Sequence, residues 1–63
     1  MTTTTINKVK QGEFIKLSED SSVVYVRNHY DRATNSFSIS RADDINRESF
    51  VKSRRVVYIG FTY

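Results

Sequence analysis

Three side chains that can bind nucleic acid alternate along one segment of the chain: Tyr25, Arg27 and His29. Residues two apart in a β-strand project from the same face, so a ring, a guanidinium and an imidazole would lie in a row. Exposed rings stack on bases, and cations contact phosphates, in proteins that bind single strands. The pattern equally fits solvated strand residues with charged cross-strand neighbours such as Glu13 or Asp31. Both interpretations stay open at this point.

A second candidate site is the basic segment that precedes the last apolar stretch and contains Lys52, Arg54 and Arg55. A loop of like charge can hold a phosphate backbone, and its affinity would fall as the salt concentration rises. Arg41 would extend this positive surface. Short basic loops also occur as solvated turns that discourage edge pairing of strands. The formal net charge of +3 permits nucleic-acid binding without requiring it.

Acidic residues form no recognisable catalytic or metal motif. Asp43, Asp44 and Glu48 lie close together, and Asp31 follows His29 by two residues, but neither group has the spacing of a calcium loop. The chain has one His, no Cys and no glycine-rich phosphate-binding motif. Its 63 residues also leave little room for a cofactor cavity beside a core. We therefore expect no enzyme, no metal, no cofactor and no small-molecule substrate.

Tyrosines provide a third candidate surface, because their hydroxyl groups need water or a partner. Clustered on the outside, Tyr25, Tyr58 and Tyr63 would form an adhesive patch, since Tyr is enriched in protein interfaces. The phenylalanines are instead expected to face the core: Phe14, Phe37, Phe50 and Phe61. The Tyr-rich surface predicts a protein partner or a second copy of the chain.

The composition indicates which elements must position these residues. Seven Val, five Ile and six Thr stand against one Leu and two Ala, and β-branched residues favour strands. Alternating apolar positions predict strands at about residues 13–17, 23–30, 37–41 and 56–63, with a further apolar stretch at 50–51. The turn residues of 31–36 predict a β-hairpin between the second and third of these strands. Gly12 and Gly60 would allow a turn and a bend.

Two segments are expected to lie outside the strands. Residues 1–6 carry few side chains of core size, so they predict a flexible N-terminal tail. Residues 43–48 begin with two acidic residues, which suit the positive end of a helix dipole, and they predict one short helical turn. A single domain over residues 7–63 follows.

The simplest fold for these elements is an all-β, five-stranded, strongly curled antiparallel barrel, because a flat sheet of this size would expose an apolar face. Such a barrel resembles the Src-homology-3-like and oligonucleotide-binding-like classes. The runs VKQGEFIKL, VVYVRNHYDR, FSISRADDIN, ESFVK and VVYIGFTY also resemble small β proteins of unknown function that bacteria and their phages encode. This resemblance implies a fold and no activity.

Two functional classes remain. The first is a non-catalytic interaction module that binds a protein partner or itself, through the Tyr-rich face or through the C-terminal strand, which has no charge after Arg55. The second is a single-stranded DNA- or RNA-binding protein that uses the alternating row and the basic loop. The lack of Cys and of any signal-peptide or membrane-spanning run predicts a cytoplasmic protein with no membrane partner.

Overall fold

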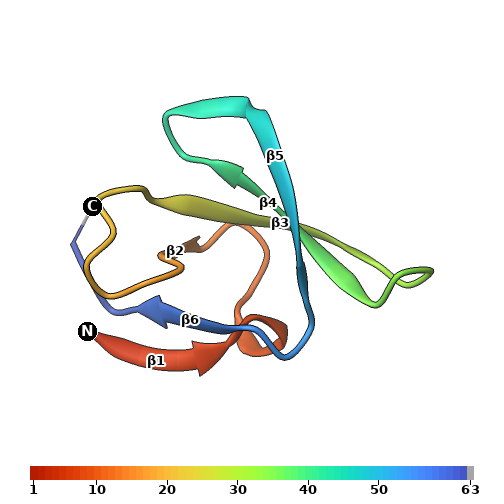
Figure 1. Cartoon of the computed structure of the whole chain (residues 1–63), viewed down its shortest axis with the longest axis horizontal. Coiled ribbons are helices and arrows are strands. Elements are labelled where there is room, and N and C mark those ends of the chain that lie inside the picture. Colours follow the sequence, from red (N-terminus) through yellow and green to blue (C-terminus); the bar gives the residue numbers. More distant parts are fainter. Residues whose placement is uncertain (63) are drawn as a thin grey trace.

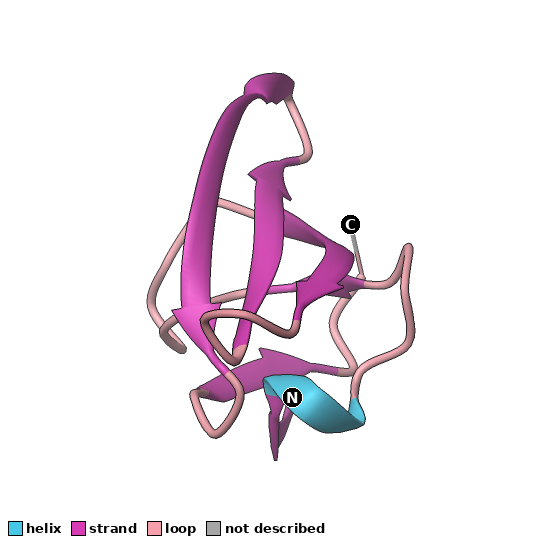
Figure 2. Ribbon diagram, turned by 90° about the vertical axis from the view of Figure 1, so that its right-hand side faces the viewer, coloured by secondary structure: helices cyan, strands magenta, loops and turns pink. Residues whose placement is uncertain are grey.

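The computed structural model describes residues 1–62 and shows an all-β chain with two antiparallel sheets (Figure 1). The smaller sheet pairs β1 (Thr2–Thr5) with β6 (Val56–Ile59). The larger sheet has the strand order β2-β3-β4-β5. Its strands are β2 (Phe14–Ile15), β3 (Tyr25–Asp31), β4 (Ser36–Arg41) and β5 (Asp44–Lys52). A 3-10 turn, η1 (Ile6–Lys8), follows β1 and lies beside the smaller sheet (Figure 2).

One isolated bridge connects the two sheets. Lys16, just after β2, exchanges two backbone hydrogen bonds with Tyr58 of β6, with N to O distances of 3.0 and 2.8 Å. β6 is therefore paired on both sides, and the outermost strands are β1 and β5. Neither sheet closes on itself within the described residues, so the five-stranded barrel stays a prediction.

The core lies between the sheets. Its buried side chains come from both of them and from the segment that connects β1 to β2: Ile6, Val9, Ile15, Phe37, Ile39 and Val57. Leu17, Tyr25, Val51 and Ile59 pack around this cluster and are partly buried. Phe14 and Phe50 are 44% and 55% exposed, so the prediction that all four phenylalanines face the core is wrong for these two.

The N-terminal residues form a strand rather than the predicted tail. Thr2 to Thr5 pair in register with Ile59 to Val56. Ile6 is fully buried, and its backbone N–H donates to the carbonyl of Arg55 at 2.9 Å. Threonine is β-branched and suits a strand without filling a core, while the single large side chain after the Thr run anchors the segment.

The predicted helical turn over residues 43–48 is also wrong, because this segment turns the chain and enters β5. The Arg41 guanidinium pairs with the Asp43 carboxylate at 3.1 Å, and the Asp44 carboxylate accepts from the backbone N–H of Asn46 at 3.2 Å. The two acidic side chains thus bind a nearby guanidinium and a nearby backbone N–H within the turn. A helix of about six residues is too short to compete with the ladder that β5 forms with β4.

The predicted hairpin between the second and third strands is confirmed as β3 and β4. The Asp31 carboxylate accepts from the backbone N–H of Ala33 at 3.0 Å, and Asn35 adopts a positive φ of 54°. Asp and Asn are the residues that favour these conformations in turns. A bulge between Arg27 and Tyr30 then shifts the register of β3 against β4.

The C-terminal strand is shorter than predicted and pairs with β1 along its whole length. β6 ends at Ile59, and Gly60 follows with a φ of 77°, which fits the predicted bend. The part of the prediction that concerns Tyr63 lies outside the described residues. β1 pairs with all four residues of β6, while on the other side Lys16 bridges Tyr58 alone among the described residues, so association through this strand stays a prediction.

Candidate functional site

The predicted outer row of Tyr25, Arg27 and His29 in β3 does not lie together on an outer face, contrary to the prediction. Arg27 stands opposite Ile39, which is fully buried, and directly opposed residues share a face of the sheet. Tyr25 shares that face and packs against the core. His29 lies within the bulge between Arg27 and Tyr30 and is exposed. The structure therefore separates His29 from the other two.

Arg27 is held inside the fold rather than presented to a ligand. Its guanidinium carbon lies 4.4 Å from the centre of the Phe37 ring, and its Nη1 donates to the Asn28 carbonyl at 2.9 Å. Its Nε is buried and has no hydrogen-bond partner among the described residues. A cation stacked on a core ring stabilises the fold through a cation–π contact, so Arg27 has a structural role.

The Tyr-rich patch is not formed by the residues the structure describes. Tyr25 lies on the inner side of the larger sheet, whereas Tyr58 belongs to β6 and is half-buried. Tyr58 neighbours the buried Val57, so its side chain projects from the opposite face of the smaller sheet. Arg41 forms an ion pair with Asp43 at the surface, which partly offsets its charge.

A different set of residues meets on the outer face of the larger sheet, the face that points away from the core. Three serines alternate along β4, and each stands opposite a side chain of β5. The pairs are Ser36 with Lys52, Ser38 with Phe50, and Ser40 with Glu48. Although they face outward, the serines are buried because larger neighbours flank these small side chains. We call these six residues the serine face.

Hydrogen bonds fix the centre of the serine face. The Asn28 side-chain amide donates to the Ser40 hydroxyl at 2.6 Å and lies 3.5 Å from the Ser38 hydroxyl. The Ser38 hydroxyl in turn donates to the Glu48 carboxylate. Because each hydroxyl has a partner, burying these polar groups is not costly. The network holds the Glu48 side chain against the sheet.

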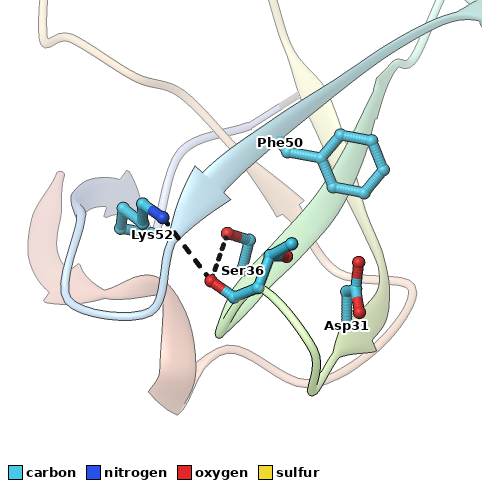
Figure 3. Close-up of a pocket in the computed structure, with 5 residues that line it drawn as sticks. Asp31, Ser36, Phe50 and Lys52 are labelled. Atoms are coloured by element: carbon cyan, nitrogen blue, oxygen red, sulfur yellow. Dashed lines mark hydrogen bonds between the residues drawn. The ribbon is translucent and has the colours of Figure 1, made fainter.

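A shallow groove lies at one end of the serine face, with a volume of about 360 Å³ (Figure 3). It is lined by Asp31, Thr34, Ser36, Phe50 and Lys52. The Phe50 ring and the Lys52 ammonium both reach it from β5, and the ammonium lies 3.5 Å from the Thr34 carbonyl. The groove thus combines one apolar wall with one negative and one positive group.

β5 is the most exposed strand of the fold and forms the free edge of the larger sheet. Eight of its nine residues are exposed, and only Val51 is partly covered. Its pairing with β4 is regular from Glu48 to Lys52 and is interrupted between Ser40 and Arg41. Ile45 lies in the interrupted part and is 78% exposed. The regular part therefore offers unpaired backbone groups beside an exposed ring.

The basic loop follows the regular part of β5 and is a turn. The Arg55 N–H donates to the Lys52 carbonyl at 3.0 Å, and the Ser53 carbonyl accepts from Asn7 of η1. These bonds bring η1, which carries Lys8, beside the loop. Lys8, Arg54 and Arg55 are exposed and make no ion pair within the described part of the chain. This set, with Lys52, is the basic end.

Sequence reasoning found Lys52 but missed Phe50 and Glu48 as parts of a surface site. Their signal is present as a period of two: Ser36, Ser38 and Ser40 in one strand, and Glu48, Phe50 and Lys52 in another. Assigning residues 43–48 to a helical turn hid the second half of this pattern.

The described residues contain no group of three or more His, Cys, Asp or Glu side chains placed to hold a metal ion. They also contain no helix that is long and apolar enough to cross a membrane. Comparison with protein-family models, curated proteins and solved structures finds no match to this chain.

Proposed function

We propose that the chain is a non-catalytic interaction module that binds an extended protein segment along the free edge of β5 and the adjoining serine face. The observation that carries this proposal is the exposure of β5, which ends the larger sheet without a neighbour among the described residues. An exposed edge presents a row of unpaired backbone groups, and an added strand satisfies them.

The side chains of the edge support a specific partner rather than open aggregation. Phe50 is 55% exposed and borders the groove, so it can serve as an apolar anchor. Glu48 and Lys52 place one charge of each sign on either side of it. Charged side chains on an edge discourage indiscriminate strand pairing, so a partner must match them.

β5 fits this proposal better than the surfaces predicted from the sequence. β6 is paired with β1 along one side and bridged by Lys16 at Tyr58 on the other, and β1 has four residues with neither a charge nor an aromatic ring. A closed five-stranded barrel, which the sequence predicts, would have to cover the β5 edge within the same chain. The proposal instead assigns that edge to a second chain.

Amide NMR spectra of the labelled protein test the proposal. We expect shifts at residues 48–52 and at the facing serines, either as the protein concentration rises or when an excess of an unlabelled peptide of alternating Thr and Val is added. Strand addition changes the hydrogen bonding of edge amides directly, so these amides should shift more than those of β6.

Phe50→Asp and Ile45→Asp provide the matched pair for this experiment. Both introduce the same charge at an exposed apolar position of β5, but only Phe50 lies in the regularly paired part. We expect Phe50→Asp to abolish the shifts and Ile45→Asp to retain them. The proposal is wrong if neither titration shifts residues 48–52 of the wild-type protein.

Nucleic-acid binding is a second candidate, and the basic end favours it. Four cations, Lys8, Lys52, Arg54 and Arg55, come from two segments that backbone hydrogen bonds hold together. Clustered exposed cations attract a phosphate backbone. The candidate site differs from the predicted one, because Tyr25 and Arg27 share the partly buried inner face of the larger sheet and do not lie beside the basic end.

Reversing two charges of the basic end tests this second candidate. If the loop contacts phosphates, Arg54→Glu with Arg55→Glu should weaken binding of a short single-stranded oligonucleotide and reduce the salt dependence of log K by about 2. Fluorescence anisotropy over a range of salt concentrations measures both. A slope equal to that of the wild-type protein would exclude these arginines from a nucleic-acid site.

A further inference from the structure

The regular part of β5 is complementary to itself when it runs antiparallel. Residues 48–52 read Glu-Ser-Phe-Val-Lys, so Phe50 has a negative side chain two positions before it and a positive one two positions after it. All three project from the serine face, because they oppose Ser40, Ser38 and Ser36. Reversing the direction of this segment exchanges the positions of the two charges and leaves the ring in place.

We propose that the segment bound at the β5 edge is β5 of a second copy of this chain, paired antiparallel about a two-fold axis at Phe50. This inference rests on the proposed function and names its partner. In such an isologous pair each residue faces the one equally far on the other side of the axis. Phe50 then meets Phe50 of the second copy, and Glu48 meets Lys52 of the second copy on both sides of the axis.

Cross-strand chemistry favours this register. Aromatic pairs and opposite charges that stand directly opposite each other stabilise a sheet, and like charges destabilise it. An axis at Glu48 would place Glu48 opposite Glu48 of the second copy, and an axis at Lys52 would place Lys52 opposite Lys52. Either arrangement brings like charges together. Moving it to Ser49 or Val51 would place the Phe50 ring opposite Glu48 or Lys52. Of the five axis positions at residues 48–52, the one at Phe50 alone places the two rings opposite each other and each Glu48 opposite a Lys52.

The surroundings of the two charged groups agree with this pairing. Glu48 is oriented on the serine face by the Ser38 hydroxyl, and a carboxylate can accept further hydrogen bonds. The Lys52 ammonium has only a long contact of 3.5 Å to the Thr34 carbonyl, so it can turn toward a carboxylate at little cost. The interrupted pairing of residues 45–47 limits the ladder to the self-complementary part.

Such pairing closes after two copies. Each copy uses the same strand, so the association has two-fold symmetry and no free β5 edge remains. β1 becomes the outer strand at both ends, and it is short and uncharged. The expected product is a dimer in which the larger sheets of the two copies join into one continuous sheet. A filament is not expected.

A charge-reversal cycle measured by sedimentation equilibrium tests the proposal. We expect the wild-type protein to dimerise reversibly, and we expect Glu48→Lys or Lys52→Glu alone to raise the dimer dissociation constant about tenfold, because each creates two like-charge pairs. The double variant E48K/K52E should restore the wild-type constant, since it exchanges the two charges. Circular dichroism spectra should show that every variant retains its strands.

Three other outcomes would overturn the inference, and they bear differently on the proposed function. A monomer at every concentration excludes a second copy, while the peptide titration still decides whether β5 binds another protein. A dimer that E48K/K52E weakens as much as the single variants do contradicts the register but keeps the edge. A dimer that persists unchanged with Phe50→Asp places the contact away from β5 and contradicts the inference, and the peptide titration again decides the proposed function.

Discussion

Replacing Phe37 with alanine is expected to remove a large part of the free energy of unfolding of the protein. Phe37 is buried in the core, and its ring lies 4.6 Å from that of Tyr30 and 4.4 Å from the Arg27 guanidinium. Truncating a buried Phe to Ala costs about 3–5 kcal/mol. The whole domain is expected to have a free energy of unfolding of roughly 3–9 kcal/mol, from about 0.05–0.15 kcal/mol per residue. Urea denaturation followed by circular dichroism measures the loss.

Phe50→Ala is the matched control, because it removes the same side chain from the exposed edge. We expect a loss in the free energy of unfolding within about 0.5–1 kcal/mol, as is usual for surface substitutions. Equal losses for Phe37→Ala and Phe50→Ala would contradict the assignment of the two faces of the larger sheet, and with it the proposed role of Phe50.

Replacing Ile6 with alanine is expected to have the second large effect, a loss of about 2–5 kcal/mol in the free energy of unfolding. Ile6 is fully buried between the sheets, and its backbone ties η1 to the end of the basic loop. A flexible tail would tolerate the change. This variant therefore distinguishes the tail predicted from the sequence from the paired strand and buried Ile6 of the structure.

Ile45→Ala is the control for Ile6→Ala, since the same side chain is 78% exposed there. We expect it to leave the midpoint of thermal unfolding almost unchanged. A thermal midpoint of Ile6→Ala equal to that of the wild-type protein would contradict the observed packing of β1 and η1.

The sequence predicts the parts of this fold that depend on local signals. The all-β class follows from the β-branched residues, and the β3–β4 hairpin follows from Asp31 and Asn35 at turn positions. The core positions Phe37, Ile39 and Val57 follow from alternation within single strands. Each of these predictions needs information from only a few neighbouring residues.

Predictions that depend on pairing between distant segments are less successful. Thr2 to Thr5 become a strand because β6, more than fifty positions later, supplies the backbone partners. The acidic segment at 43–48 resembles a helix start when read alone, but β4 draws it into a ladder. In both cases hydrogen bonds to a remote strand outweigh the local preference.

The candidate site shows the same limitation. Alternation in β3 correctly places Tyr25 and Arg27 on one face, but it does not reveal which face is buried, and the bulge before Tyr30 separates His29 from them. Phe50 has the residue type of a core position, and its exposure follows from standing opposite Ser38 on the outer face. Burial of a face is decided by what packs on it, which no single strand encodes.

Amide hydrogen exchange of β5 at low and high protein concentration tests the central claim most directly, because pairing at an edge protects its amides from solvent. If β5 pairs with β5 of a second copy, the outward-facing amides among residues 48–52 should exchange more slowly at the high concentration. Those of the interrupted part, residues 45–47, should change much less. Exchange rates at residues 48–52 that do not depend on concentration, measured where the protein is dimeric by sedimentation, would contradict the account.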